Sequence, residues 1–320
     1  MKKILITGAA GFIAPHIIEE SLKRNWEVIA VDLKEVPENL KYKDVKYLKK
    51  DVRNLDKDDL KAVDFIAHLA FITNIPNSIK YPIETTYDNI DMSAILLKKA
   101  EEANVKKVIF SSTASVYGNP IKDNVAENDD LSPLNPYAET KLNLEKYILD
   151  KSKSENISYI ILRYFNVAGA DEKLRSGLIS KHSTHLIKIA SEVAVGKRDE
   201  IIINGNDYDT RDGTTIRDYI HVSDLADIHL VSAKYLLDKN QSNIFNCGYG
   251  NGYSVKEVIN TYNKFLDKKI KSKIGPRRPG DSKMVVADPS KFNKTLNWEP
   301  KFNNLEYILK TAYEWEKKIN

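Results

Sequence analysis

The 320-residue chain is poor in cysteine and has no long apolar run. Its one cysteine, Cys247, cannot form a disulfide within the chain, so we expect a reducing compartment, the cytoplasm. No stretch approaches the ~20 apolar residues that a membrane-spanning helix needs, so we expect no membrane partner. Hydrophobic residues still make up 42% of the sequence, which is enough for a packed core and excludes a disordered chain.

The chain also lacks blocks of one charge. It has 49 basic and 45 acidic residues, for a formal net charge of +4, and they are spread along the whole sequence. Nucleic-acid-binding proteins concentrate Lys and Arg on one face, so we expect no nucleic-acid partner. The densest basic stretches, KYKDVKYLKK and KKIKSKIGPRRPGD, are explained by solvated lysines beside an occasional specific arginine.

The N-terminal stretch MKKILITGAAGFIAPH allows two interpretations. Two lysines before a short apolar run are typical of a secretory signal, whereas Gly8 and Gly11 are typical of a turn that binds phosphate. Thr7, Gly8 and Gly11 break the apolar run within a few residues. We therefore expect a phosphate-binding turn rather than an export signal.

Apolar runs of strand length alternate with helical patterns over the first 166 residues. The runs KILIT, EVIAVD, VKYLKKD, DFIAHLA, KKVIFSS and ISYIILRYF predict strands. Helices are expected after KILIT up to Arg24, over about 83–103, and from about Tyr137. Strands rich in Ile and Val between helices are typical of a parallel sheet buried on both faces. The sequence thus predicts an α/β protein with a Rossmann-type, doubly wound parallel sheet.

Longer loops rich in Gly, Asn and Asp follow Asn166, with helical patterns at about 183–196, 223–238, 254–266 and 303–318. Loops of this kind carry binding residues more often than core positions do. We therefore expect a nucleotide-binding Rossmann domain at residues 1–168, whose cofactor the next motif indicates, and a smaller α/β lobe for the substrate at 169–320. Some segments of this lobe are expected to return to the first domain.

The segment TGAAGFIA lies between the first strand and the first helix, where a dinucleotide pyrophosphate binds free helix N–H groups. Gly8 permits the tight turn and Gly11 lets the main chain approach the phosphates. Ala14 replaces the last glycine of the pattern, at a position that only has to let helix and strand pack. Asp32 ends the second strand, where a carboxylate binds ribose hydroxyls and repels a 2′-phosphate, so we expect NAD rather than NADP.

Tyr137 and Lys141 are four residues apart on an expected helix, so their side chains point the same way. One charge about 4 Å from a phenol is worth about 4 kcal/mol at an effective dielectric constant of ~20, or about 3 pKa units. We therefore expect the Lys141 ammonium, helped by an oxidised nicotinamide ring, to lower the pKa of Tyr137 toward neutrality, where a general base is most useful. Ser112 and Thr113, at the end of an expected strand, are placed to face Tyr137.

With these motifs the chain resembles the extended short-chain dehydrogenase/reductase superfamily, and within it the UDP-glucose 4-epimerase family. The resemblance covers nearly the full length and rests on TGAAGFIA, DVRN, HLA, SSTASVYG, PYAETK, LRYFNVAGA, GNDYDTRDGTTIRDYIHVSDLAD, NCGYGNGYSV, PRRPGD and LNWEP. It implies a 4-epimerase of UDP-glucose and UDP-galactose. In such an enzyme, tightly held NAD removes hydride from sugar C4, the keto intermediate rotates, and hydride returns to the other face.

The resemblance also implies roles for individual residues. Tyr137 is the implied base, Lys141 lowers its pKa and binds the nicotinamide ribose, and Thr113 binds the 4-hydroxyl of the sugar. The implied NAD-binding residues are Gly8, Gly11, Phe12, Ile13, Asp32, Leu33, Asp51, Val52, Leu69, Ala70, Asn89, Ser111, Tyr137, Lys141 and Tyr164. Those implied for the UDP-sugar are Thr113, Asn166, His185, Asn204, Arg217, Arg278, Asp281 and Val285, with the two arginines on the diphosphate.

Two departures from the epimerase pattern bear on the cofactor and the reaction. Phe71 to Asn74 follow HLA, where the family usually has glycine or alanine and then a lysine near the cofactor. The 4,6-dehydratases of the superfamily carry an Asp-Glu pair directly after the catalytic threonine, whereas Ala114 and Ser115 follow Thr113 here. Elimination of water needs that extra acid and base, so dehydration is not expected.

Three further departures concern the substrate. Asn204 stands where an aromatic residue commonly packs near uridine, and His185 stands where an asparagine commonly meets the substrate, so the nucleobase stays open. Val285, four residues after Asp281, replaces a tyrosine that is frequent in enzymes restricted to UDP-glucose. We therefore expect room for an N-acetyl group, and hence turnover of UDP-GlcNAc and UDP-GalNAc.

Other interpretations stay open at this stage. The same superfamily contains 4-epimerases of UDP-pentoses and uronates and C4 dehydrogenases, and a non-catalytic NAD-binding regulatory protein would keep the fold but lose Tyr137 or Lys141. His182 and His185 are three apart, as in some metal sites, but no cysteine or third histidine lies near them in the sequence, so we expect no metal. The resemblance favours a homodimer, which the sequence alone does not show.

Overall fold

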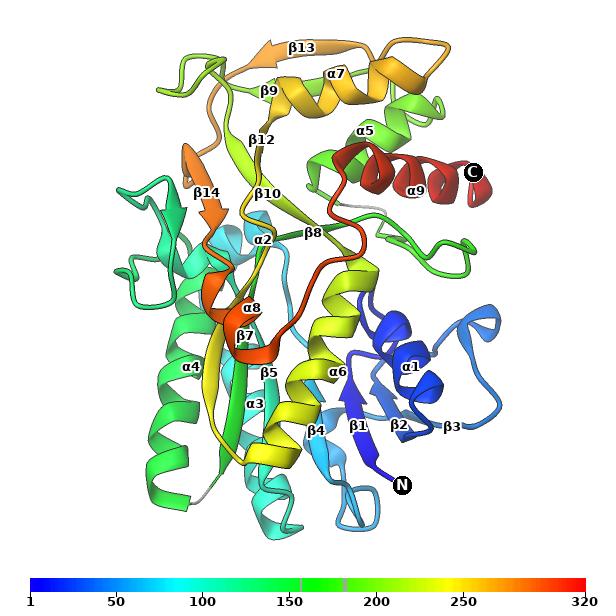
Figure 1. Ribbon diagram of the computed structural model, residues 1–320, viewed down its shortest axis with the longest axis vertical. Helices are drawn as coiled ribbons and strands as arrows, with labels where there is room; N and C mark the ends of the chain where they lie inside the picture. Colours follow the sequence, from blue (N-terminus) through cyan, green and yellow to red (C-terminus); the bar gives the residue numbers. More distant parts are fainter. Residues whose placement is uncertain (156, 181–182) are drawn as a thin grey trace. The chain divides into compact units, whose positions relative to one another are not determined.

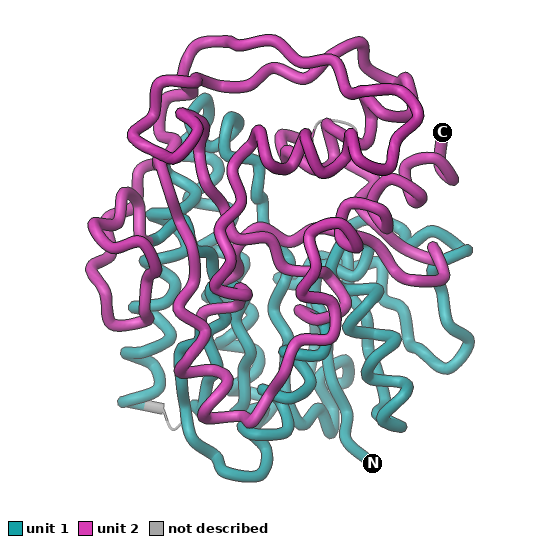
Figure 2. The backbone as a smooth tube through the Cα atoms, turned by 45° about the horizontal axis from the view of Figure 1, so that its top comes forward, with its two compact units in different colours: residues 1–116, 135–163, 226–245 teal, residues 117–134, 164–225, 246–320 magenta. Residues whose placement is uncertain are grey.

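The computed structural model describes residues 1–155, 157–180 and 183–320, and the chain forms two compact units (Figures 1 and 2). Unit 1 consists of residues 1–116, 135–163 and 226–245, and unit 2 of residues 117–134, 164–225 and 246–320. Each unit therefore draws on several separate segments of the sequence. The single domain boundary after residue 168 stays a prediction.

Unit 1 holds nearly all of a seven-stranded sheet with the order β11-β7-β5-β4-β1-β2-β3. The strands are β1 (Lys3–Thr7), β2 (Glu27–Asp32), β3 (Val45–Lys49), β4 (Phe65–His68), β5 (Lys107–Thr113), β7 (Ser158–Tyr164) and β11 (Asn243–Cys247). The pairings β1–β2, β1–β4, β2–β3 and β4–β5 are parallel, and Leu5 lies opposite both Ile29 and Ile66. The predicted Rossmann-type α/β fold is confirmed, with the order of the strands reversing between β1 and β4.

Helices cover both faces of this sheet, which explains the apolar runs in its central strands. The helices are α1 (Ala14–Lys23), α2 (Ile75–Lys80), α3 (Pro82–Glu102), α4 (Pro136–Glu155) and most of α6 (Val222–Lys239), with short 3-10 turns η1 (Glu38–Leu40), η2 (Val52–Asn54) and η3 (Ala114–Tyr117). Side chains of α3 and α4, such as Leu97 and Leu144, pack with Phe110 in one apolar cluster. On the other face, α1 contacts β1 and β2, and Arg24 after α1 donates to Asp227 of α6 at 2.6 Å (Figure 1).

Unit 2 contains a mixed sheet and a separate pair of strands. The sheet has the order β12-β10-β14-β6, with β8 also paired to β10. Its strands are β6 (Asn124–Val125), β8 (Asn166–Ala168), β10 (Ile216–His221), β12 (Gly252–Ser254) and β14 (Met284–Ala287), and β9 (Ile201–Asn204) pairs with β13 (Ser272–Gly275). Strand β12 runs antiparallel to β10, whereas β8 and β14 run parallel to it. Strands this short, joined by long connections, leave no periodic pattern in the second half of the sequence.

The helices of unit 2 confirm the predicted pattern to within a few residues. They are α5 (Leu186–Ala194), α7 (Val255–Phe265), α8 (Ser290–Leu296) and α9 (Leu305–Lys318), of which α8 is absent from the prediction. Helix α7 begins with a capping box: Glu257 N donates to Ser254 Oγ at 3.0 Å, and Ser254 N donates to the Glu257 carboxylate at 2.8 Å. Within the described residues, none of the helices has the length and apolar character needed to cross a bilayer.

Candidate active site

The glycine turn of unit 1 leaves main-chain groups uncovered between β1 and α1. Gly8 has a φ of +77°, a left-handed conformation that favours glycine. A side-chain carbon on Gly8 would lie 3.0 Å from the main-chain nitrogen of Ala70, and one on Gly11 would lie 3.0 Å from the Gly8 carbonyl oxygen. Ile13 at the N-terminus of α1 makes no side-chain capping bond, and Ala14 is buried, in keeping with its expected packing position.

Asp32 is tied to this turn at the end of β2. Its carboxylate accepts hydrogen bonds from Ala10 N at 2.9 Å and from Lys34 N at 2.8 Å. Each carboxylate oxygen keeps further lone pairs for hydroxyl donors. Gly8, Gly11 and Asp32 therefore meet at one end of the sheet, and they fit a dinucleotide: the bare turn suits a pyrophosphate and the fixed carboxylate suits a ribose diol. Leu33 is exposed beside Asp32, and Phe12 and Ile13 are half-buried in the turn.

Asp51 and Val52 follow β3 and begin the turn η2. The Asp51 carboxylate accepts from Arg53 N at 2.8 Å and from the Arg53 guanidinium at 2.7 Å. Arg53 in this way holds the pKa of Asp51 below its usual value. The Val52 side chain packs in the apolar core beside Leu55. A cofactor contact at Val52 would therefore come from its main chain.

The segment after β4 is fixed on both sides. Thr7 Oγ1 accepts from Leu69 N and Ala70 N, both at 3.1 Å. The buried Asn89 amide accepts from Ile72 N at 2.8 Å and donates to Ile72 O at 3.1 Å. Asn89 thus positions the main chain after Ala70.

Tyr137 and Thr113 meet as the sequence predicts. Thr113 lies close enough to Tyr137 to lower the pKa of its hydroxyl, and the Thr113 hydroxyl accepts from Ser115 N at 3.2 Å. Within the chain itself, burial raises the pKa of Tyr137 to about 12 and Thr113 opposes this only in part, so its lowering by Lys141 together with oxidised NAD stays a prediction. The Lys141 ammonium lies 6.0 Å from the centre of the Tyr137 ring.

Lys141 is turned toward β5. Its ammonium donates to the carbonyl oxygen of Ser111 at 2.6 Å and lies 2.9 Å from the centre of the Phe71 ring. Burial lowers the pKa of Lys141 well below its usual value, although the negative charge of Glu145 opposes this. Thr113, Tyr137, Lys141 and Ser111 therefore form one cluster in unit 1.

Glu145 is a member of this cluster that the sequence analysis missed. Its buried carboxylate accepts from the Arg163 guanidinium at 2.7 Å and 3.1 Å, and from the Ser112 hydroxyl. Ser112 thus faces Glu145, while Thr113 alone faces Tyr137. The available signal was spacing, because Tyr137, Lys141 and Glu145 are each four residues apart on one face of α4.

In unit 2, Arg217 of β10 lies at the centre of the candidate substrate residues. Its guanidinium donates to Ile216 O at 2.8 Å and Ser282 O at 2.7 Å and lies 3.5 Å from the Asp281 carboxylate. Burial lowers the pKa of Arg217, Asp281 opposes this, and the positive charge of Arg278 adds to it. Val285 is buried directly beside Arg217 in the parallel pair β10–β14.

Arg278 brings further positive charge to this group. It acts on Arg217 and also on His185 before α5, where desolvation and the charge of Arg278 lower the pKa of the imidazole. Arg217, Arg278, Asp281 and His185 therefore lie within electrostatic range of one another. Two guanidiniums near one carboxylate suit a diphosphate attached to a ribose.

The remaining predicted residues lie at strand ends. Asn166 begins β8 opposite Tyr219, Asn204 ends β9 opposite Gly275, and Tyr164 ends β7. Among the described residues no group of His, Cys, Asp and Glu could hold a metal ion, and His182 lies outside the described residues.

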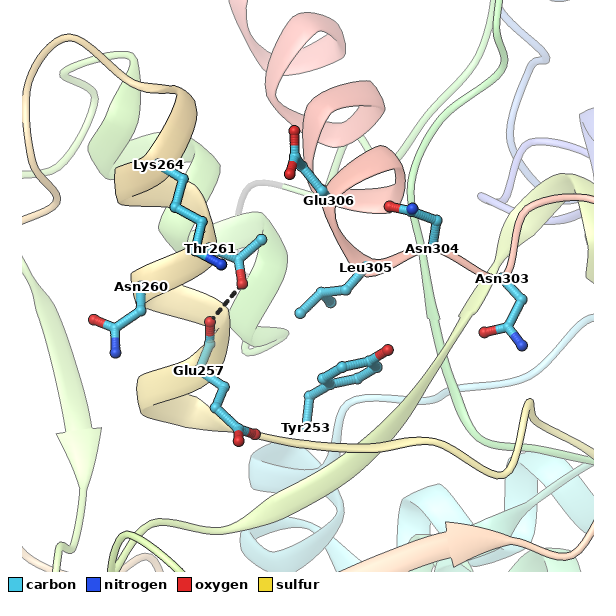
Figure 3. A pocket seen from close by; sticks show the side chains of 9 residues that line it. All are labelled: Tyr253, Glu257, Asn260, Thr261, Lys264, Asn303, Asn304, Leu305 and Glu306. Carbon is cyan, nitrogen blue, oxygen red and sulfur yellow. Dashed lines mark hydrogen bonds between the residues drawn. The ribbon is translucent and has the colours of Figure 1, made fainter.

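A cavity of about 600 Å³ in unit 2 contains none of the predicted site residues (Figure 3). It lies between α7 and the start of α9, and its walls are Tyr253, Glu257, Asn260, Thr261, Lys264, Asn303, Asn304, Leu305 and Glu306. Several of its polar groups serve the helices themselves: Thr261 donates to Glu257 O at 2.8 Å, and Asn304 caps α9 through Tyr307 N at 2.9 Å. We assign it no ligand.

Known proteins resemble this chain over its full length. Residues 4–248 match the NAD dependent epimerase/dehydratase family. The UDP-glucose 4-epimerase of Halalkalibacterium halodurans is 39% identical over 319 residues, which cover 98% of this chain and 96% of that protein.

Solved structures of similar proteins point to the same family. The UDP-glucose 4-epimerase of Bifidobacterium longum, in complex with NAD⁺ and UDP, has a TM-score of 0.92 and 36% identity, covering 99% of this chain and 98% of its own. The UDP-Glc/GlcNAc 4-epimerase of Campylobacter jejuni has a TM-score of 0.84 and 39% identity, covering 99% and 100%. By sequence and by structure, this chain belongs to the NAD dependent epimerase/dehydratase family.

Proposed function

We propose that this protein is an NAD-dependent 4-epimerase that interconverts UDP-glucose and UDP-galactose. The observation that carries the proposal is the grouping of Thr113 and Tyr137 with the buried Lys141, four residues further along the same helix and bonded to the Ser111 carbonyl oxygen. A phenol, a hydroxyl and an ammonium in one cluster can move the proton of a sugar hydroxyl. Full-length relatives with the same activity support the choice of substrate.

The cofactor is NAD, which when bound supplies the acceptor and donor of hydride for the sugar carbon. We propose that Gly8, Gly11, Phe12 and Ile13 bind its pyrophosphate and that Asp32 binds the adenine ribose. Around the rest of the cofactor we place Leu33, Asp51, Val52, Leu69, Ala70, Asn89, Ser111, Tyr137, Lys141 and Tyr164. The bare glycine turn and the fixed Asp32 carboxylate support this assignment.

Tyr137 acts as the base in this proposal. Its phenolate accepts the proton of the 4-hydroxyl, and Thr113 holds that hydroxyl in line. With a pKa of about 12 the phenol is neutral at physiological pH, so the base needs positive charge nearby. Lys141 supplies that charge, since its ammonium belongs to the same buried cluster.

The nucleotide part of the substrate is assigned to unit 2. We propose that Arg217 and Arg278 bind the diphosphate, that Asn166 and Asp281 bind phosphate and ribose, and that His185 and Asn204 lie near the nucleobase. The charge of Arg278, which helps to lower the pKa of Arg217, supports a site for a doubly charged group. The small side chain of Val285 supports turnover of UDP-GlcNAc and UDP-GalNAc as well, as does the likeness to the Campylobacter jejuni enzyme.

The proposal also covers the division of the chain into two parts, the oligomeric state and the cellular compartment. Residues 1–168 form the cofactor-binding part and residues 169–320 the sugar-nucleotide part, with residues 226–245 returning to the first. The enzyme is a homodimer, for which the exposed Ile83 and Tyr87 of α3 and Tyr147 of α4 supply apolar surface. It works in the cytoplasm, where the single thiol of Cys247 stays reduced.

The test is incubation of the purified protein with a panel of UDP- and GDP-sugars, followed by chromatography of the products. We expect interconversion of UDP-glucose with UDP-galactose and of UDP-GlcNAc with UDP-GalNAc, without net formation of NADH. Steady release of NADH would instead indicate a C4 dehydrogenase. Conversion restricted to UDP-pentoses or uronates would reassign the sugar.

A further inference from the structure

The Lys141 ammonium is enclosed mostly by uncharged groups. Lys141 is 2% exposed, and its one hydrogen bond to the described part of the chain goes to the Ser111 carbonyl oxygen at 2.6 Å. The ring centres of Phe71 and Phe110 lie 2.9 Å and 5.0 Å from its nitrogen. A buried ammonium with so little compensation is unstable unless the rings contribute.

The charged and titratable groups around Lys141 supply little net negative charge. Glu145, one turn further along α4, is bound by Arg163 of β7 and by Ser112 of β5. His68 of β4 is neutral, because burial and the charge of Lys141 lower its pKa to about 3. Tyr137 is neutral too, since burial raises its pKa. Among the described residues, the nearest group besides the Ser111 carbonyl oxygen that attracts the ammonium is therefore the face of the Phe71 ring.

Phe71 is held in place by its surroundings. The hydrogen bonds of Thr7 to Leu69 and Ala70 fix the main chain before it, and those of Asn89 to Ile72 fix the main chain after it. Its ring makes an edge-to-face contact with Phe110 at 5.4 Å and a tilted contact with His68 at 4.5 Å. The ring is thus placed by contacts within the chain itself.

We propose that Phe71 is a positioning residue for Lys141: the face of its ring holds the ammonium beside the Ser111 carbonyl oxygen and stabilises its charged form. The negative face of an aromatic ring attracts a cation, most strongly where water is excluded. The role rests on the proposed function, in which Tyr137 works as a base only while Lys141 is charged. Phe71 therefore acts through Lys141 and not on the sugar.

The first test measures the proton of Lys141 directly. In full-length protein freed of NAD, the pH titration of the Lys141 side chain is followed by carbon-13 NMR, with its signal assigned from Lys141→Arg. Phe71→Leu is expected to lower the midpoint of this titration by about one pH unit, and Phe71→Tyr, which keeps the ring, to restore it. Phe110→Leu is the matched control for lost packing, because its ring is farther from the ammonium.

The second test follows turnover and cofactor. Loss of the charge on Lys141 raises the pKa of Tyr137, so the rise of kcat with pH is expected to move to higher pH in Phe71→Leu. On the acid side, each pH unit of this shift lowers kcat about tenfold. An unchanged Lys141 titration in folded Phe71→Leu, or an equal shift in Phe110→Leu, overturns the proposal. Should Phe71→Leu not fold, Phe71→Met serves in its place. If wild type converts no UDP-sugar, the proposed function fails, but the NMR titration still decides the role of Phe71.

Discussion

The Tyr137 hydroxyl is the one atom on which turnover depends most in this proposal. Tyr137→Phe removes it without changing the volume of the ring, so the fold and the bound NAD remain. The rate of UDP-galactose conversion is expected to fall by about 10²- to 10⁴-fold, the usual contribution of a general base. Tyr235→Phe is the control, because it removes a surface hydroxyl that is bonded to Gln241 at 2.8 Å. A rate near wild type in Tyr137→Phe would exclude Tyr137 as the base.

Arg277 and Arg278 are neighbours in the chain, but only Arg278 is proposed to bind the substrate, so the two can be compared. Arg278 lies in the electrostatic group of Arg217 and His185, whereas the exposed Arg277 pairs with Asp207 at 2.8 Å and lies 4.2 Å from the Tyr208 ring centre. Arg278→Ala is expected to weaken UDP binding about 10- to 100-fold, the loss of a charge-assisted hydrogen bond, and Arg277→Ala much less. Isothermal titration with UDP measures both variants. Equal effects of the two substitutions would count against Arg278 as a diphosphate ligand.

Among single residues, contacts that follow from residue spacing along a helix or strand were predictable from the sequence. Contacts that depend on the path of a loop were not. The meeting of Tyr137 with Thr113, and of Asp32 with the glycine turn, follows from strand ends and helix periodicity. The contact of Phe71 with Lys141 depends on how Thr7 and Asn89 hold the chain after β4, which no local pattern encodes.

At the scale of elements, the turn from β1 to α1 depends on Gly8. Gly8→Ala places a methyl group 3.0 Å from main-chain atoms of Leu69 and Ala70, in addition to the strain of a positive φ. Gly196→Ala is the matched control, because Gly196 has a similar φ of +83° and no atom within 4 Å of the added carbon. The left-handed conformation lowers the free energy of unfolding of both variants by about 1–2 kcal/mol, and the crowding at Gly8 lowers that of Gly8→Ala by about 1–3 kcal/mol more.

Urea denaturation and the NAD content of the purified proteins measure this difference. Gly8→Ala is expected to be the less stable variant and to lose NAD, and Gly196→Ala to keep its NAD. If Gly8→Ala retained NAD at the wild-type level, the glycine turn would not be the pyrophosphate site.

The elements of the two halves were predictable to different degrees. The strands β1, β2, β4, β5 and β7 are continuous apolar runs, and alternation with helices identified their parallel sheet. Strands β6, β8 and β12 are two or three residues long, too short for a periodic signal. Their order also rests on long-range pairs such as Val286 with Asn124, which periodicity does not contain.

At the scale of the whole molecule, the buried His68 makes stability depend on pH. Burial and Lys141 lower its pKa to about 3, whereas the unfolded chain has the ordinary value of about 6.5. The unfolded state therefore binds one more proton between these limits, and the free energy of unfolding falls as the pH drops below about 6.5. The slope from this group is at most about 1.4 kcal/mol per pH unit.

Denaturation between about pH 7 and pH 5 measures this slope against that of His68→Gln, which cannot take up the proton. The contribution of His68 is the difference between the two slopes, so any constant loss of stability in the variant cancels. Identical slopes would mean that His68 is not held neutral in the folded protein.

In the proposed reaction, the configuration at one carbon of a UDP-hexose inverts, and the hydrogen on that carbon returns to it. The most direct measurement is incubation of the purified protein with UDP-glucose that carries deuterium at C4, followed by mass spectrometry and NMR of the sugar nucleotides. The account predicts UDP-galactose that retains the deuterium at C4. Unchanged UDP-glucose, or a product whose label has passed to the solvent, would contradict it.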